Sequence, residues 1–213
     1  SQVQFFILFV IISILIVTFW NYQSTATFFN NFRSSFFNTI SIFTGTGYTT
    51  QDFNNWGSFI IVLFLFLMLV GGCAGSTTCG IKIFRLQILY KSAKIQIFKL
   101  LNPHGVSVAK YNKIPVSEAI TSSVMGYFFM FIISYIVITL LLSFVGNDFL
   151  TSLSGAATSL ANVGPGLGNV IGPTKTFAGL SDTTKWILII GMLTGRLELL
   201  SVIILLTPSF WKN

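Results

Sequence analysis

Apolar segments alternate along this chain with short stretches in which apolar and polar residues are mixed. The apolar segments are residues 3–20, 59–70, 124–145 and 186–206. As a helix with a rise of 1.5 Å per residue, the first would be about 27 Å long, close to the thickness of the hydrocarbon core of a bilayer. We therefore predict membrane-spanning helices. The segment 59–70, at about 18 Å, is too short to cross alone.

Two shorter segments, residues 28–43 and 149–160, are apolar but interrupted by polar or small side chains. The first contains Asn30, Asn31, Arg33, Ser34, Ser35, Asn38, Thr39 and Ser41. Such a segment is too polar for a lipid-exposed span, whereas a re-entrant half-helix explains both its length and its polarity. The negative end of the first helix dipole would then favour a cation at the residues that follow.

An uncharged, Gly-rich stretch follows each half-helix, at residues 44–50 and 161–168. Irregular backbone at membrane depth is tolerated only where it lines a cavity or is buried in protein. Carbonyl and hydroxyl oxygens of such a stretch can replace the hydration shell of a cation. We interpret residues 44–50 as an ion-filter segment of a potassium-conducting membrane protein. K⁺ at the filter is the only bound metal that we expect.

The order of span, half-helix, Gly-rich turn and span occurs twice. Placing Gly47 on Gly164 aligns Thr46 with Val163, and Ser41 with Thr158. The predicted fold class is an all-α membrane protein with two such repeats, half of a four-repeat ion pore, because a cation filter takes oxygens from about four loops. The predicted domains are a pore repeat at residues 1–101, a cytoplasmic linker at 102–115 and a second pore repeat at 116–213.

The second span of the first repeat is interrupted by a ten-residue segment rich in small residues. It consists of Gly71, Gly72, Cys73, Ala74, Gly75, Ser76, Thr77, Thr78, Cys79 and Gly80. A break of this kind predicts a broken helix or an intramembrane loop at a functional site. A phosphate-binding loop is disfavoured, because no strand precedes the segment and no Gly-Lys-Ser/Thr ends it.

Composition and charge support a membrane protein with a defined orientation. Hydrophobic residues make up 53% of the chain and charged residues only 8%, against about 25% charged in a soluble domain. The net charge of +7 reflects basic residues in one loop rather than a nucleic-acid partner. Residues 82–113 carry Lys82, Arg85, Lys91, Lys94, Lys99, Lys110 and Lys113 and no acidic residue. The positive-inside rule places this loop in the cytoplasm and the filter loops on the extracellular or periplasmic side of the cell (inner) membrane.

The basic loop begins with a helical spacing of apolar residues. Ile83, Leu86, Leu89 and Tyr90 share one helix face. This predicts a basic amphipathic helix on the inner membrane surface or on a cytoplasmic partner, with a solvated charged face as the alternative. Because the chain opens with Ser1 and an apolar helix, without the basic start or cleavage site of a signal peptide, we interpret it as a piece of a longer chain.

Three motifs together resemble the Trk/Ktr potassium-uptake family, and within it the TrkH-type membrane subunit. They are Gly71–Lys82, the run from Asn162 to Gly166, and Gly195-Arg196-Leu197-Glu198. The resemblance covers the whole chain, as the third and fourth of the family's four pore repeats. It implies membrane lipid as the surroundings, a homodimer in which each subunit has its own pore, and a cytoplasmic nucleotide-binding regulatory subunit.

The resemblance also assigns residues. Gly47 matches the filter glycine of the third repeat, and Gly164 that of the fourth. The filter residues that it implies are Gly45, Thr46, Gly47, Tyr48, Asn162, Val163, Gly164 and Pro165. The segment 71–80 matches a gating loop under the filter, although Cys79 stands where many relatives have glycine.

Arg196 matches the arginine that faces this loop in the family. An arginine near the middle of span 186–206 is costly, at roughly 2.5–3.5 kcal/mol, and should face a cavity or a partner. Loop carbonyls and water are the expected partners, because Glu198 lies on a different helix face. An arginine that is satisfied within the bundle without a gating role is the alternative.

The remaining candidate residues are weaker. Asp52 and Asp182 would lie at the outer mouth and concentrate cations, or belong to ordinary turns. Cys73 and Cys79 match no zinc spacing, and we interpret them as small packing thiols, with a redox switch as the alternative. The single histidine, His104, is in a turn. We expect no cofactor and no enzymatic activity.

Two other functional classes stay open. One is a less selective sodium/potassium transporter or a potassium-binding pump subunit of the same superfamily. The other is a non-conducting fragment for dimerisation and docking.

Overall fold

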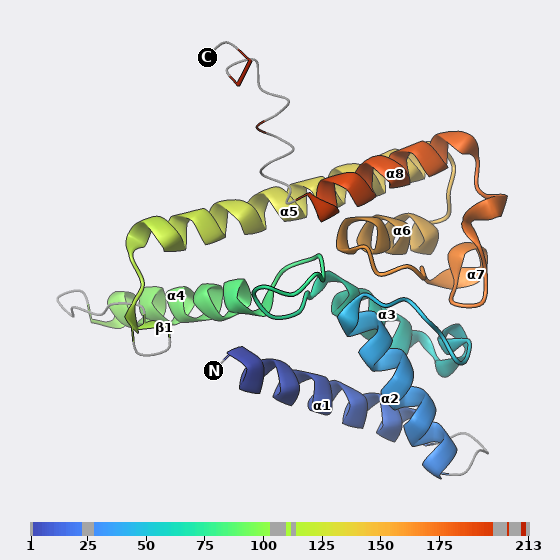
Figure 1. The fold of residues 1–213 in the computed structure, drawn as a ribbon, viewed down its shortest axis with the longest axis horizontal. Coiled ribbons are helices and arrows are strands. Elements are labelled where there is room, and N and C mark those ends of the chain that lie inside the picture. Colours follow the sequence, from blue (N-terminus) through green and yellow to red (C-terminus); the bar gives the residue numbers. More distant parts are fainter. Residues whose placement is uncertain are drawn as a thin grey trace.

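In its described part the protein is helical, apart from turns, loops and one short strand pair. The computed structural model describes residues 2–22, 28–102, 110–111, 114–197, 204 and 210–211 (Figure 1). The elements are α1 (Gln2–Asn21), α2 (Phe28–Thr44), the 3₁₀ helix η1 (Phe53–Trp56), α3 (Ser58–Leu69), α4 (Ile83–Leu101), β1 (Lys110–Tyr111), β2 (Ile114–Pro115), α5 (Glu118–Phe144), α6 (Phe149–Ala161), α7 (Gly168–Ile171), the 3₁₀ helix η2 (Phe177–Gly179) and α8 (Asp182–Arg196). The predicted all-α fold class is confirmed.

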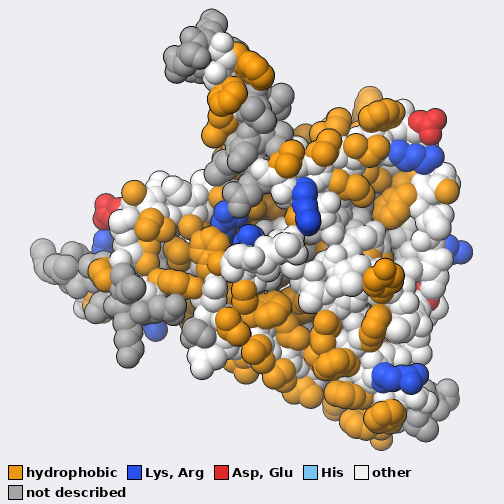
Figure 2. All heavy atoms as spheres, viewed as in Figure 1, with side chains coloured by type: hydrophobic (Ala, Val, Ile, Leu, Met, Phe, Trp, Pro, Cys, Tyr) orange, Lys and Arg blue, Asp and Glu red, His pale blue; other side chains and the backbone are white. Residues whose placement is uncertain are grey.

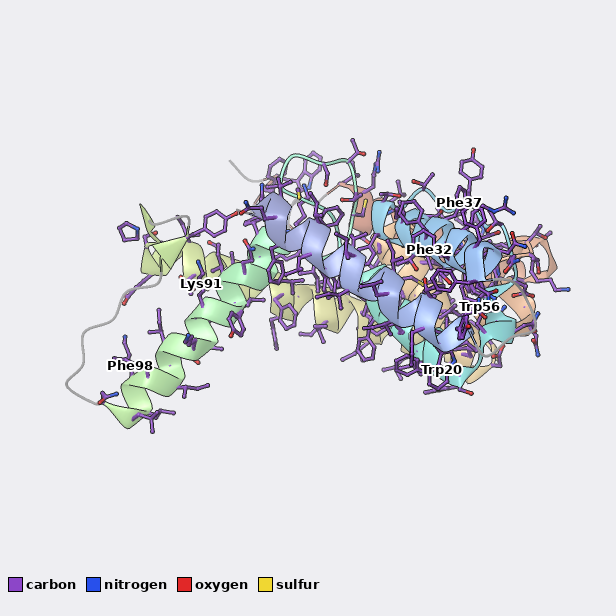
Figure 3. All side chains as sticks on the ribbon, turned by 90° about the horizontal axis from the view of Figure 1, so that it is seen from below. Trp20, Phe32, Phe37, Trp56, Lys91 and Phe98 are labelled. Atoms are coloured by element: carbon purple, nitrogen blue, oxygen red, sulfur yellow. The ribbon has the colours of Figure 1, made fainter. Side chains whose placement is uncertain are left out.

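Among the described residues, two helices, α1 and α5, are long and apolar enough to cross a membrane. In the most apolar part of each, only 22% of the residues are buried inside the protein. A core helix of a soluble protein would be mostly buried, so these apolar faces suit lipid or further protein. Figure 2 shows hydrophobic side chains spread over large parts of one face of the molecule. At the end of α1, the indole N–H of Trp20 donates to the carbonyl oxygen of Trp56 at 2.9 Å (Figure 3).

The two predicted repeats are visible as two helical groups. In the first, α2 packs against α1 and α3; in the second, α6 packs against α5 and α8 (Figure 1). The groups are joined where α3 packs on α6. A shared apolar core, which includes Phe43, Phe53 and Phe64 of the first repeat and Ala157 and Val163 of the second, lies at this junction.

The half-helices α2 and α6 bury most of their polar residues within the protein, whereas Asn30 and Arg33 of α2 are exposed. Asn31, Ser34, Asn38 and Ser41 are among the buried residues of α2. In α6 every residue from Ser154 to Ala161 is buried. The buried polar residues therefore face other parts of the protein rather than lipid. Both helices end within one residue of the predicted boundary.

The second span of the first repeat is broken as predicted. The helix α3 ends at Leu69, the residues from Gly71 to Gly80 form a loop, and α4 begins at Ile83. A parallel bridge between Val70 and Ile81 closes the base of the loop. From there α4 projects away from α1–α3, with Lys91 and Phe98 along its length (Figure 3).

One detail differs from the sequence-based expectations. The predicted linker 102–115 contains the antiparallel pair β1–β2 in its described part, where Tyr111 pairs with Ile114. The helix α8 begins at Asp182 and its described part ends at Arg196, followed by Leu197, so the expected position of Arg196 near the middle of span 186–206 stays a prediction. Lys113, His104 and Glu198 lie outside the described residues, as does most of 198–213.

Candidate functional site: two glycine turns and an intramembrane loop

The first Gly-rich turn follows the C-terminus of α2 directly. Gly45 and Gly47 have φ angles of 64° and 77°. The N–H of Thr46 donates to the carbonyl oxygen of Ser41 at 3.0 Å, which folds the turn back on the helix end. Tyr48 points outward and is 72% exposed. The turn therefore places several backbone oxygens close to the negative end of the α2 dipole.

The second turn follows α6 in the same way. Asn162 is the C-cap in a left-handed conformation, with a φ of 51°, and Gly164 has a φ of 116°. The N–H of Gly164 donates to the hydroxyl of Thr158 at 3.0 Å. The Asn162 amide donates to the carbonyl oxygen of Met192 at 3.1 Å, which attaches this turn to α8.

The backbone hydrogen bonds of the two turns correspond residue by residue. Thr46 donates to Ser41 at 3.0 Å, and Val163 donates to Thr158 at 3.1 Å. These are the pairs that the alignment of Gly47 with Gly164 places on one another. The internal repeat therefore extends to individual hydrogen bonds, despite poor sequence identity.

The two turns lie against one another, backbone to backbone. A Cβ atom added to Gly47 would lie 2.5 Å from the carbonyl oxygen of Val163, and one added to Gly164 would lie 3.3 Å from the Cα of Gly47. No side chain fits at Gly47 without a shift of the opposite backbone. The structure thus brings together the predicted filter residues Gly45, Thr46, Gly47, Tyr48, Asn162, Val163, Gly164 and Pro165 in one place between the repeats.

A polar side chain of each half-helix holds the residue three positions after its glycine. In the first repeat, the Asn38 amide donates to the Thr50 hydroxyl at 3.0 Å and accepts from the Thr50 N–H at 3.1 Å. In the second, the Ser154 hydroxyl accepts from the Leu167 N–H at 3.0 Å. Both exits from the turns are therefore tied to the helix that precedes them.

Further contacts join the outer segments of the two repeats, and Asn54 is the residue that sequence reasoning missed. Its side-chain amide binds both backbone polar groups of Gly168. The Thr49 hydroxyl donates to the carbonyl oxygen of Pro173 at 3.0 Å. Nothing in the polar turn around Asn54 marks it as a contact to a residue so far along the chain.

The acidic candidates at this side have structural partners. Asp52 caps η1 by accepting from the Asn54 N–H at 3.1 Å, and it accepts from the Thr174 hydroxyl at 3.3 Å. Asp182 pairs with Lys185 at 3.3 Å on the exposed first turn of α8. A role in concentrating cations stays a prediction for both.

The loop 71–80 is stabilised mainly by its own backbone and hydroxyl groups. The N–H of Gly72 donates to the Thr78 hydroxyl at 2.8 Å, and the Thr78 and Ser76 hydroxyls are 2.7 Å apart. The N–H of Gly71 donates to the carbonyl oxygen of Ile81 at 3.0 Å. Cys73 and Cys79 are both free thiols. The loop is a defined small structure, held at its base by the bridge between α3 and α4.

Arg196 reaches this loop from the end of α8. Its guanidinium donates to the carbonyl oxygen of Thr77 at 2.9 Å and lies 3.9 Å from the sulfur of Cys79. On the opposite flank, the Tyr127 hydroxyl of α5 donates to the carbonyl oxygen of Gly80 at 3.5 Å. The loop of the first repeat is therefore held by two helices of the second. Any gating role of these contacts stays a prediction.

The start of the chain also touches the loop. The Gln2 side-chain oxygen accepts from the N–H of Ala74 and from the hydroxyl of Tyr111, each at 3.4 Å. Burial and, to a smaller extent, the nearby Cys73 raise the pKa of Tyr111, so its hydroxyl keeps the proton that it donates. This bridge between α1, the loop and β1 has no signal in the sequence.

Half-helices that end in paired glycine turns, beside a broken span, define the architecture of a membrane ion-transport protein. A family model described as TrkH, cation transport protein, matches residues 3–212. The chain belongs to the TrkH family, and the predicted resemblance is confirmed. This family consists of transport proteins rather than enzymes.

Individual relatives agree with this assignment. The chain is 44% identical over 213 residues to the Trk system potassium uptake protein TrkI of Halomonas elongata, and covers 43% of that protein. It is 36% identical to the corresponding TrkH of Vibrio parahaemolyticus, over 97% of this chain and 41% of the relative. The crystal structure of the potassium transporter TrkH from Vibrio parahaemolyticus matches with a TM-score of 0.90 and 34% identity, over 99% of this chain and 45% of that one. The chain thus spans about two fifths of the length of these curated relatives.

Proposed function

We propose that this chain forms part of a pathway that carries K⁺ across the membrane. The turns around Gly47 and Gly164 supply two of the filter loops, and their backbone oxygens replace part of the hydration shell of the ion. The contact between Gly47 and Gly164 carries this proposal, because it brings the turns of two repeats to one point. The names of the relatives, which are potassium uptake proteins, support K⁺ as the ion.

The loop from Gly71 to Gly80 acts in this proposal as the gate, and Arg196 as the residue that holds it. The hydrogen bond from Arg196 to Thr77 supports this role, since it ties an irregular segment to a helix of the other repeat. The positive charge next to the loop would also repel a cation on its path. Loss of the guanidinium should therefore ease passage.

Orientation and partners follow from charge and exposure. We propose that α4 lies on the cytoplasmic side and the glycine turns near the outer side, because Arg85, Lys91, Lys94 and Lys99 lie on or at the start of α4. Exposed apolar residues of α4 suit lipid, a second copy of the protein or a regulatory nucleotide-binding subunit: Tyr90, Ile97, Leu100 and Leu101. Light scattering of the purified protein, alone and with its regulatory subunit, tests the homodimer and the complex.

Rubidium uptake into liposomes that contain the full-length protein tests the transport proposal. We expect uptake that excess K⁺ abolishes and Na⁺ does not, and we expect Gly164→Ser to reduce it. Equal competition by Na⁺ and K⁺ would instead favour a less selective cation transporter. Uptake indifferent to Gly164 would place the pathway elsewhere.

A further inference from the structure

A cavity of about 270 Å³ lies beside the loop, on the side of α4 and the end of α8. Three basic residues from two elements line it: Lys82, the N-cap of α4, Arg85 in the first turn of α4, and Arg196 at the end of α8. The rest of the lining comes mostly from the loop, between Ser76 and Gly80. Figure 2 shows basic side chains both near the middle of the face and at its edges, whereas the acidic ones visible there lie only at its edges.

The positive charge of this cavity has no acidic partner in the part of the chain that the structure describes. No Asp or Glu lines the cavity, and the one ion pair among the described residues joins Lys185 to Asp182, neither of which lines it. Glu118 begins α5 and forms no ion pair with Arg85 within 4.0 Å. Three cations that converge without a carboxylate repel one another, so a bound anion would stabilise the arrangement.

The start of α4 adds to this positive potential. Lys82 is the N-cap of α4, and no side chain caps the helix there. The positive end of the α4 dipole therefore lies at the cavity, although the N–H of Ile83 already donates to the carbonyl oxygen of Gly72 at 3.1 Å and that of Arg85 to Lys82 at 2.9 Å. Lys82 and Arg85 at this end of α4 and Arg196 at the end of α8 line the same cavity.

The two arginines are held in place before any ligand arrives. The guanidinium carbon of Arg85 lies 3.5 Å from the centre of the Tyr127 ring, a cation–π contact that fixes its plane. Arg196 is oriented by its bond to the Thr77 carbonyl oxygen. A guanidinium has five N–H donors, so both arginines keep donors for a further acceptor. Planar forks of this kind match the oxygens of a phosphate group.

We propose that this cavity binds a phosphate group, either as free inorganic phosphate or a small phosphorylated solute, or as the headgroup of an anionic phospholipid. Its volume is below the roughly 300–1,000 Å³ of drug-sized ligand sites, so it suits a single phosphoryl group or headgroup. In this proposal the Lys82 ammonium supplies a compact positive charge, and the Arg85 guanidinium supplies a planar pair of N–H donors for two phosphate oxygens. The inference is independent of the proposed conduction, because binding is measured without transport.

Thermal unfolding of the purified full-length protein in an uncharged detergent tests the site. The protein is titrated with potassium phosphate, or with potassium chloride at matched K⁺ and ionic strength, so that neither K⁺ nor screening differs. We expect a saturable stabilisation by phosphate alone. Lys82→Gln and Arg85→Gln should each raise the apparent Kd for phosphate about tenfold, since each removes a charge-assisted hydrogen bond.

Lys94→Gln is the matched control, because Lys94 is an exposed lysine of the same helix that does not line the cavity. It should leave the apparent Kd unchanged. Stability in chloride reports whether each variant is folded, and either of the two cavity variants suffices for the comparison. Stabilisation by phosphate no greater than by chloride, or equal loss in all three variants, overturns the proposal.

Nanodiscs of phosphatidylcholine, with and without phosphatidylglycerol, distinguish the source of the phosphate group. If the headgroup is the natural ligand, phosphatidylglycerol should stabilise the protein and abolish the response to inorganic phosphate, and Lys82→Gln should lose the stabilisation by phosphatidylglycerol. If the ligand is a soluble phosphate, the response should persist in both lipids. Both results support the site, whereas a phosphatidylglycerol effect that Lys82→Gln leaves intact counts against it.

Discussion

The side-chain amide of Asn54 binds both backbone polar groups of Gly168, donating to its carbonyl oxygen at 3.1 Å and accepting from its N–H at 3.0 Å. Asn54 belongs to η1 of the first repeat, and Gly168 begins α7 of the second. This pair fixes the outer segments of the repeats relative to one another. It therefore also fixes how the two glycine turns meet.

Asn54→Ala should destabilise the protein through this pair. Each of the two lost hydrogen bonds leaves a partly buried backbone group without a partner, at a cost of about 1–3 kcal/mol. We expect a lower melting temperature of the purified full-length protein. Asn55→Ala is the control, because Asn55 is exposed and its side chain makes no comparable contact among the described residues. Equal melting temperatures for the two variants would contradict this account of Asn54.

Gly195→Ala should disturb the packing of α8 on α6. A Cβ atom at Gly195 would overlap the backbone carbonyl oxygen of Leu160, which cannot move without displacing the end of α6. We expect a loss of about 1–3 kcal/mol in stability. Gly126→Ala on α5 meets no atom within 4 Å and should be neutral or slightly stabilising, because alanine favours a helix. Thermal unfolding of the two variants side by side checks the prediction, and a neutral Gly195→Ala would refute it.

Arg196→Ala should raise the rate of ion uptake. The substitution removes the bond to the Thr77 carbonyl oxygen and the positive charge next to the loop. A bond to a charged group contributes about 1.5–3 kcal/mol, so we expect a rise on the order of tenfold in initial rubidium uptake. Unchanged or lower uptake, with normal expression, would show that Arg196 does not restrain the loop.

Asn38→Ala should lower ion discrimination without touching the glycine turn itself. Asn38 holds Thr50 through two hydrogen bonds, so its loss frees the exit of the first turn. Ser154→Ala should act alike in the second repeat, because the Ser154 hydroxyl holds Leu167. The ratio of K⁺ to Na⁺ needed to halve rubidium uptake measures the effect. Unchanged ratios in both variants would argue against a role of these anchors.

Sequence patterns predicted the helices well because each pattern has a local physical cause. The polar residues of α2 identify a half-helix, since lipid cannot satisfy them, and the glycines between Gly71 and Gly80 identify a break in a span. The register of the repeats followed from one pair of glycines, and the hydrogen bonds of Ser41 and Thr158 agree with it.

Contacts between distant segments could not be predicted in this way. The pairs of Asn54 with Gly168 and of Gln2 with Ala74 depend on how the helices pack, and an asparagine in a turn looks the same with or without a distant partner.

Rubidium uptake by Gly47→Ser and Gly45→Ser variants of the full-length protein tests the central claim most directly. A side chain at Gly47 would meet the Val163 carbonyl oxygen at 2.5 Å, whereas one at Gly45 would lie at an ordinary 3.5 Å from the Asn162 carbonyl oxygen. We predict that Gly47→Ser loses most uptake or its preference for K⁺ over Na⁺, and that Gly45→Ser retains more of both. Uptake and competition that are the same in Gly47→Ser as in the unsubstituted protein would contradict the assignment of this turn as a filter.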